Sequence, residues 1–228
     1  MKNVILTIDD GPSDITRDIV DYLNKNNIPA LMFFIGNNIE KYFDSAIYAV
    51  ESGILIGNHS YSHKSFSLLS EEEAYREIKI TDSMLHELYK RCGINKFKKY
   101  FRFPFGDKGS NNKAAIQKIL SDLNYENSVN LNIKYNWYYK NDLNLNKDVF
   151  WTFDCEDYLL SDEKCNIRIG DIFKKIYNEH PDQGGSLMNT ESDEIIIMHD
   201  HPWSNKVVNK YYEIILDKIS ELNINFIN

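Results

Sequence analysis

Residues 4–12 run Val-Ile-Leu-Thr-Ile-Asp-Asp-Gly-Pro, a short apolar segment that ends in two carboxylates and a Gly-Pro pair. A run of about four to eight apolar residues bounded by glycine or proline predicts a buried β-strand. Two acidic side chains at the end of a buried strand are costly unless a positive group lies nearby. We therefore expect Asp9 and Asp10 to have a cationic partner.

The composition limits the class of protein. The chain has 228 residues, of which 43% are hydrophobic and 26% are charged, and we expect one globular domain over residues 1–228. The formal net charge of −8 argues against a nucleic-acid partner bound through its phosphates. Three cysteines do not form a disulfide framework, so a reducing compartment, the cytoplasm, is expected.

Two further expectations concern membranes and export. No cationic and apolar leader precedes residue 4, so we expect no secretory signal, although a domain cut from a longer exported protein would look the same. The longest apolar run, residues 30–35, is far below the roughly 20 residues of a membrane span. The sequence leaves the oligomeric state open.

Apolar runs alternate with amphipathic segments along the chain. The expected strands are residues 4–8, 30–35, 54–56, 100–103, 128–133, 149–153, 194–198 and 225–227. The expected helices are residues 15–25, 39–52, 71–91, 113–123, 169–177 and 207–222. Ser70 and Glu73 form a capping box before the third helix. Residues 124–147 form an elaboration without clear periodicity, and residues 181–193 form a loop.

This alternation predicts an α/β fold with a parallel sheet and helical crossovers. We expect about seven parallel strands in a distorted, closed or nearly closed (β/α) barrel, with an open doubly wound sheet as the second choice. In such arrays the residues that follow the strands face one end, where active sites lie. The polar residues found there are Asp9, Asp10, His59, His63, Arg102, Asp154, Asp157 and His199.

His59 and His63 are four residues apart, so both can face one side of a helical turn and bind one metal ion. The alternative is two surface or core histidines. Two histidines and one carboxylate, with positions left for water, are typical of a catalytic metal site.

Asp9 and Asp10 also have a structural interpretation, in which they belong to a turn and to the acidic start of the following helix. This interpretation accounts for one aspartate more easily than for two. One of them can bind the metal and the other can accept a proton, and the residues alone leave open which does which.

Three further groups have both a chemical and a structural interpretation. Arg102 can hold a catalytic carboxylate ionised, or form a surface or structural ion pair. The Pro-Phe-Gly turn at residues 104–106 can expose a backbone N–H that stabilises an oxyanion. His199 is a candidate general acid or a satisfied structural histidine. Either Asp154 or Asp157 could orient His199.

Cys155 is a weaker candidate. A thiol nucleophile needs a group that deprotonates it, and no residue pattern around Cys155 specifies one.

Five segments in order resemble the motifs of the polysaccharide deacetylases, the nodulation-type domain of carbohydrate esterase family 4. They are Thr-Ile-Asp-Asp-Gly-Pro (7–12), His-Ser-Tyr-Ser-His (59–63), Arg-Phe-Pro-Phe-Gly (102–106), Asp-Cys-Glu-Asp-Tyr (154–158) and Ile-Ile-Met-His (196–199). Together they span nearly the whole chain.

The resemblance implies a distorted (β/α) barrel and metal-dependent removal of the acetyl group from an N-acetylated sugar in a polysaccharide, a peptidoglycan-type chain or a lipid-linked saccharide. The expected cofactor is one divalent metal, zinc, with cobalt, iron or nickel as alternatives. The implied roles are general base for Asp9, metal ligands for Asp10, His59 and His63, tuning of the base for Arg102, pairing of Asp157 with the general acid His199, and an oxyanion donor at the Phe105 N–H.

The chain departs from the family pattern at several positions. Ile8 replaces the usual Phe, and Tyr158 replaces the usual Trp, which still offers an aromatic wall but can reshape the sugar site. Residues 124–147 and 181–193 look extended and could narrow the groove. One alternative function is hydrolysis of small cyclic amides or other C–N bonds in a closed pocket. The last is a non-catalytic carbohydrate-binding protein, which would lack a ligand or the base.

Overall fold

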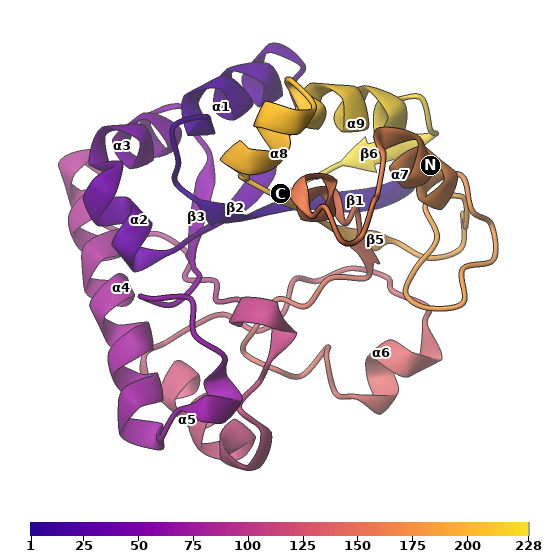
Figure 1. Ribbon diagram of the computed structural model, residues 1–228. Coiled ribbons are helices and arrows are strands. Elements are labelled where there is room, and N and C mark those ends of the chain that lie inside the picture. The colour runs from indigo at the N-terminus through magenta and orange to yellow at the C-terminus, as the bar shows by residue number, and fades with distance from the viewer. Residues whose placement is uncertain (228) are drawn as a thin grey trace.

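The structure, a computed structural model, describes residues 1–227 and contains one parallel sheet surrounded by helices (Figure 1). The strand order is β3-β2-β1-β5-β4, and β6 also pairs with β1. The strands are β1 (Lys2–Gly11), β2 (Ala30–Phe34), β3 (Leu55–Asn58), β4 (Phe153–Asp154), β5 (Glu194–His199) and β6 (Ile224–Phe226). The predicted parallel α/β architecture is confirmed.

β1 lies at the centre of the sheet and is buried along most of its length. It pairs with β2 on one side, starting at Leu6 opposite Ala30, and with β5 on the other. The register of β1 and β5 places Asp9 opposite His199. Because parallel strands end at the same edge, this register brings the acidic end of β1 next to the polar end of β5.

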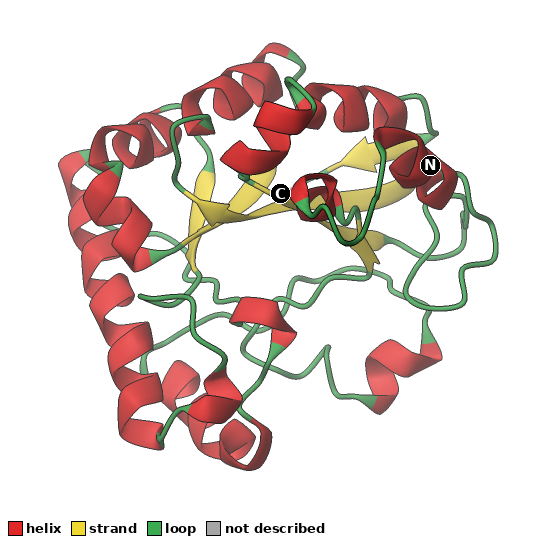
Figure 2. Ribbon diagram, viewed as in Figure 1, coloured by secondary structure: helices red, strands yellow, loops and turns green. Residues whose placement is uncertain are grey.

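Half of the ring is built from extended loops rather than regular strands (Figure 2). Beyond β3, the Asn58 N–H donates to the Tyr100 carbonyl at 2.9 Å, and the Arg102 N–H donates to the Asn58 carbonyl at 3.0 Å. The Val149 N–H then donates to the Phe101 carbonyl at 2.8 Å. Residues 149–154 lead into β4, which pairs with β5. Backbone hydrogen bonds therefore run around the whole ring and produce a distorted barrel.

About seven strands were expected, and the sheet in the structure has six. The expected strand at residues 100–103 is a single bridge at Phe101, and the one at 149–153 shortens to Phe153–Asp154. Pro104 has no N–H and begins a turn, so the first of these ladders stops almost at once.

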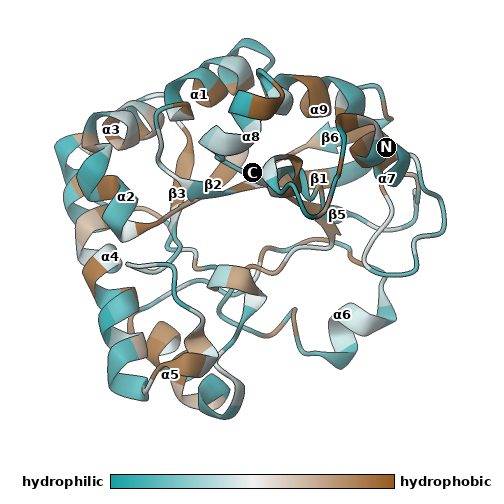
Figure 3. Cartoon of the chain, in the orientation of Figure 1, coloured by the Kyte–Doolittle hydropathy of each residue, from teal (hydrophilic) through white to brown (hydrophobic). Residues whose placement is uncertain are grey.

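The helices lie outside the ring, and most of them mix hydrophobic and hydrophilic residues along their length (Figure 3). They are α1 (Thr16–Lys25), α2 (Gly36–Lys41), α3 (Phe43–Glu51), α4 (Glu71–Arg91), α5 (Lys113–Asp122), α6 (Asn136–Lys140), α7 (Ile169–Ile176), α8 (Pro202–Val207) and α9 (Tyr211–Ser220). The capping box of Ser70 and Glu73 is present at the start of α4.

Two expected helices differ in extent from those in the structure. The predicted helix at residues 39–52 becomes α2 and α3, because Tyr42 has a non-helical backbone (φ −121°, ψ 42°). The one at residues 207–222 shortens to α9, because Lys210 adopts a left-handed conformation (φ 56°), and α8, which ends at Val207, is a further helix that the sequence did not predict. The Lys210 N–H donates to Asn205 Oδ1 at 2.7 Å, which stabilises this break.

The strand expected at residues 128–133 is absent from the described structure, and the elaboration contains α6 instead. Its backbone donors are used elsewhere: the Asn132 N–H donates to Asp193 Oδ2 and the Lys134 N–H to Ser192 Oγ. The periodicity of the sequence could not reveal these hydrogen bonds, because their acceptors are side chains about 60 residues away in the sequence.

Within residues 1–227, no helix combines the length and the apolar character that a membrane span requires. Cys92, Cys155 and Cys165 carry free thiols.

A buried polar network lies at the end of the barrel where β1 and β5 begin. Glu194 accepts hydrogen bonds from Lys2 Nζ (3.4 Å), from the Tyr135 hydroxyl (2.5 Å) and from Thr152 Oγ1 (2.5 Å). Lys2 Nζ also donates to the carbonyls of Ser186 and Asn189. The network therefore ties β1 and β5 to the elaboration and to the 181–193 loop.

We expect Lys2→Met to lower the free energy of unfolding by about 3 kcal/mol, because Glu194 stays buried without its cation. Urea denaturation measures this loss. The double variant Lys2→Met/Glu194→Gln should lose less than the sum of the two single variants. A Lys2→Met protein as stable as the parent would show that the pair does not stabilise the fold.

Candidate active site

A cleft of about 280 Å³ lies at the carboxyl ends of the strands. Its lining includes Asp9, Asp10, His59, His63, Asp154, Tyr158 and His199. Arg102 and Asp157 lie behind the cleft, where both are buried against its lining residues. All the residues that the sequence singled out for chemistry, apart from Cys155, thus lie in or directly behind one cleft.

Asp10, His59 and His63 form a group that could hold a metal ion, since their ligand atoms all lie within 4.8 Å of one another. Asp10 Oδ1 is 3.4 Å from His59 Nε2 and 3.1 Å from His63 Nε2, yet in the described part of the chain this buried atom has no hydrogen-bond partner of good geometry. A buried acceptor without a donor is costly. Two imidazole nitrogens and a carboxylate oxygen that converge in this way fit a divalent cation.

The hydrogen bond of the other ring nitrogen fixes the orientation of His59. His59 Nδ1 lies 2.9 Å from the Arg102 carbonyl. A carbonyl only accepts, so Nδ1 carries a proton, and Nε2 faces the aspartates. Asp9 Oδ2 is 3.5 Å from the same Nε2. A cation between these groups would stabilise the arrangement.

Electrostatics keep Asp10 ionised. Burial would raise the pKa of Asp10, but the neighbouring His59 and His63 outweigh that effect and hold the pKa well below its usual range. The carboxylate form that a metal ligand requires is therefore the stable one.

The loop from His59 to His63 is not the helical turn that the spacing predicted. Ser60 and His63 both have positive φ angles, 64° and 54°, so the two rings approach each other through an irregular loop. Glu77 of α4 holds this loop: Oε2 accepts from the Tyr61 N–H (3.0 Å) and the Ser62 N–H (2.7 Å), and Oε1 accepts from Ser62 Oγ (2.6 Å).

Sequence analysis missed Glu77. The available signal was a carboxylate next to Ile78 on the apolar face of α4, where it is buried. A buried carboxylate needs partners, and here the partners are the backbone groups of the metal-site loop.

Arg102 forms an ion pair with Asp9, as its Nη1 lies 2.8 Å from Asp9 Oδ1. Nη1 also donates to Thr7 Oγ1 (2.6 Å), and Nε donates to the Val149 carbonyl (2.9 Å). The guanidinium packs over the ring of Trp151, 5.6 Å from its centroid. These contacts fix the position of the cation, so Asp9 is held as an oriented carboxylate.

His199 pairs with Asp157 and not with Asp154. Asp157 Oδ1 lies 3.1 Å from His199 Nδ1, and Asp157 Oδ2 accepts from the His199 backbone N–H at 3.0 Å. Asp154 instead accepts from the Glu156 N–H. Burial alone would lower the pKa of His199, but attraction to Asp157 and the hydrogen bond with it outweigh this and raise the pKa to about 10. His199 is therefore protonated at neutral pH, with Nε2 left for the cleft.

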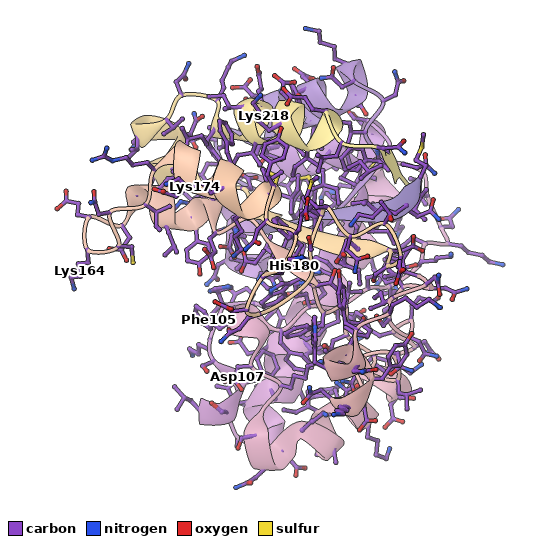
Figure 4. The ribbon with its side chains drawn as sticks, turned by 90° about the vertical axis from the view of Figure 1, so that its right-hand side faces the viewer. Phe105, Asp107, Lys164, Lys174, His180 and Lys218 are labelled. Carbon is purple, nitrogen blue, oxygen red and sulfur yellow. The ribbon has the colours of Figure 1, made fainter. Side chains whose placement is uncertain are left out.

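Phe105 lies at the edge of the cleft, and Figure 4 shows it beside Asp107 of the same turn. Its side chain is 70% exposed, and its ring meets His63 edge-on at 4.6 Å. The backbone is left-handed there (φ 58°), and within residues 1–227 its N–H donates to no protein acceptor. This N–H is available to a ligand.

Trp151 is a second residue that sequence analysis missed. It lines the cleft and contacts Arg102. A Cβ added at Gly106 would lie 2.9 Å from Trp151 Cη2, and Gly106 has a φ of 65°, so glycine is needed for the approach. A strand was expected over residues 149–153, but nothing in the sequence indicated which of its aromatic residues faces the site.

Cys155 does not take part in the cleft. The side chain is completely buried, and this burial raises the pKa of the thiol well above its usual value. The thiol nucleophile, the weakest of the alternatives, is therefore excluded.

Comparison with known proteins agrees with this geometry. The family model described as polysaccharide deacetylase matches residues 1–128. A peptidoglycan-N-acetylglucosamine deacetylase of Bacillus cereus is 34% identical over 105 residues, which are 46% of this chain and 36% of that protein. Chitin deacetylase 3 of Cryptococcus neoformans is 25% identical over 193 residues, or 82% of this chain and 40% of that protein. The chain thus matches well under half the length of these two relatives.

A solved structure shares the fold. The structure of a CE4 family pseudoenzyme from Bacillus anthracis has a TM-score of 0.65 at 18% identity, with 98% of this chain and 63% of that chain covered. At such identity the likeness concerns the fold alone. The family model covers more than half of the 228 residues, and the chain therefore belongs to the polysaccharide deacetylase family.

Proposed function

We propose that this chain is a metal-dependent hydrolase that removes the acetyl group from an N-acetylated sugar, and that residues 1–228 form one catalytic domain. The observation that carries the proposal is the convergence on one cleft of a possible metal-binding group, an oriented carboxylate and a protonated histidine. The names of the two relatives, which act on peptidoglycan and chitin, support a saccharide substrate.

In this proposal Asp10, His59 and His63 hold one divalent metal ion. Two imidazoles and one carboxylate favour zinc, with cobalt, iron or nickel as alternatives. When bound, the ion supplies a Lewis acid and lowers the pKa of a water molecule at the site.

The protein's own groups move two protons. Asp9, kept ionised by Arg102, accepts a proton from the water that attacks the amide carbon. The Phe105 N–H donates a hydrogen bond to the negative charge that develops on the carbonyl oxygen. His199, charged through its pairing with Asp157, donates a proton to the departing amine nitrogen. The C–N bond breaks, and the products are acetate and an amino sugar.

The shape of the cleft favours a saccharide over a small cyclic amide. Hydrolysis of a small cyclic amide would be expected in a closed pocket, whereas this cleft has exposed aromatic residues at its edge and adjoins a second cavity. Tyr158 meets His199 edge-on at 4.8 Å and supplies the aromatic wall for the sugar. A non-catalytic carbohydrate-binding role is disfavoured, because both the base and the complete ligand group are present in the cleft.

Asp9→Asn should reduce acetate release from N-acetylated chito-oligosaccharides by at least about 100-fold, because the water loses its proton acceptor. Elemental analysis should still find the metal, and in the parent a chelator should abolish the activity. Loss of metal from Asp9→Asn would mean that the two aspartates have exchanged roles. A parent protein without chelator-sensitive acetate release from chito-oligosaccharides or lipid-linked sugars would refute the deacetylase assignment.

Glu77→Ala should weaken metal binding by about 10- to 100-fold, since it frees the loop that carries His63. Equilibrium dialysis against a competing chelator measures the affinity. Glu72→Ala on the same helix is the matched control, because Glu72 is exposed and its ion pair is with the neighbouring Arg76 on the helix surface. Equal metal affinities in the two variants would argue against Glu77 as a positioning residue.

The pKa of His199 supplies a test by pH. In the metal-free protein we expect the His199 ring protons to titrate near pH 10 by NMR. The raised pKa means that its ion pair stabilises the fold below about pH 6.5, the ordinary histidine pKa, and that this contribution is lost as the pH rises through about 10. Asp157→Asn should move the titration down to about pH 7 or below. A His199 titration that is the same in both proteins would show that Asp157 does not charge it.

A further inference from the structure

The first turn of α2, residues 36–38, contacts both segments that carry the candidate metal ligands. One segment is the end of β1 with Asp10, and the other is the loop after β3 with His59 and His63. The two segments are far apart in the sequence, so a common metal site requires contacts that fix their relative position. α2 begins directly after β2, which lies between β1 and β3 in the sheet (Figure 1).

The Asn38 side chain holds the end of β1. Its Nδ2 donates to the Asp10 carbonyl at 2.7 Å. The two neighbouring carbonyls, those of Asp9 and Gly11, accept hydrogen bonds from backbone N–H groups. Of these three donors, only Asn38 is a side chain, so a single substitution can remove its hydrogen bond and leave the other two in place.

Two backbone N–H groups of the same turn hold the histidine loop. The Gly36 N–H donates to the Ser60 carbonyl at 2.9 Å, and the Asn37 N–H donates to the Tyr61 carbonyl at 2.9 Å. The turn and the loop approach closely, because a Cβ added at Gly36 would lie 2.6 Å from Tyr61 Cδ2 and 2.5 Å from Thr81 Oγ1. Glycine is therefore needed for this contact.

Two of the carbonyls that this turn holds belong to residues with a left-handed backbone. The φ angle is 68° at Asp10 and 64° at Ser60, which directly follows His59. Such a conformation costs free energy for a residue with a Cβ, and it persists only where surrounding contacts fix it. The backbone of Asp10 sets the direction of its carboxylate, and the backbone of Ser60 sets the path of the chain from His59 to His63.

We propose that the first turn of α2 fixes the position of Asp10 relative to the two histidines, with Asn38 as a positioning residue that acts through Asp10. The inference rests on the proposed function, because it concerns the metal site of that enzyme. It differs from the role of Glu77, which accepts from N–H groups of the histidine loop alone and does not contact β1. Metal affinity should therefore depend on α2, although none of the three ligands lies on it.

The test compares variants of two adjacent asparagines. Asn38→Leu keeps most of the side-chain volume and removes the donor, and we expect its affinity for zinc, measured by competition with a chelator, to fall by about 10- to 100-fold. Asn38→Ala should lose a similar factor, since both variants lack the donor. The matched control is Asn37→Ala, which removes an exposed side chain and keeps the backbone N–H, and its zinc affinity should stay within about twofold of the parent.

The visible absorption of the cobalt-loaded proteins reports the geometry of the ligands. We expect Asn38→Leu to shift or weaken the cobalt bands, because Asp10 is no longer held in one direction, whereas Asn37→Ala should keep the parental spectrum. Urea denaturation of the metal-free variants measures their stability separately. A role confined to stability would lower the free energy of unfolding and leave both the zinc affinity and the cobalt spectrum as in the parent.

Gly36→Ala tests the same turn from the side of the histidine loop. The added Cβ displaces Tyr61 or Thr81, so we expect zinc affinity to fall by about 10-fold or more. If this variant does not fold, the two Asn38 variants decide the question, because Asn38 is only half-buried and its replacement leaves the backbone contacts of the turn intact.

The inference and the proposed function can fail separately. Parental zinc affinity and cobalt spectrum in both Asn38→Leu and Asn38→Ala would overturn the positioning role. A parent protein that binds no zinc would reject the metal site and this inference together. A parent that binds zinc and releases no acetate from chito-oligosaccharides would reject the deacetylase assignment alone, since neither measurement depends on turnover.

Discussion

The structure depends on two neighbouring carboxylates at the end of a buried strand. Asp9 and Asp10 follow a run of residues in β1 that are almost completely inaccessible. Negative charge in such a place is stable only when positive groups are close and well oriented. Arg102 forms a direct ion pair with Asp9. Asp10 lies between His59 and His63, and one of its oxygens has no hydrogen-bond partner among residues 1–227. A metal ion bound to that oxygen would balance the negative charge of Asp10.

The parallel barrel brings these partners close to the two aspartates because the carboxyl ends of all its strands lie on one side. β1 carries the aspartates, the end of β3 leads into His59, and the register with β5 sets His199 opposite Asp9. Two further groups lie behind the residues of the cleft. Glu77 accepts hydrogen bonds from the metal-site loop, and Asp157 is hydrogen-bonded to His199. Asp9, His199 and the metal-site loop are therefore each held by a buried charged partner, which favours a site that is ready before substrate arrives.

Much of this could be predicted from the sequence, since the strands that carry the site are continuous apolar runs that end in polar residues. The motif spacing also indicated which residues meet. The sequence could not show that the ring closes through extended loops, because isolated backbone hydrogen bonds such as that of Val149 with Phe101 leave no periodic pattern. Nor could it show the irregular loop between His59 and His63, or the role of Glu77, since both depend on contacts between distant segments.

The central claim is that a cation bound by Asp10, His59 and His63 neutralises the charge of the buried carboxylates. An anomalous difference map from crystals grown with zinc tests it most directly. The account predicts one peak within about 2.0–2.2 Å of Asp10, His59 Nε2 and His63 Nε2, with Asp9 still paired to Arg102 and not bound to the ion. A map without a peak there, or with the ion held by Asp9 in place of Asp10, would contradict it.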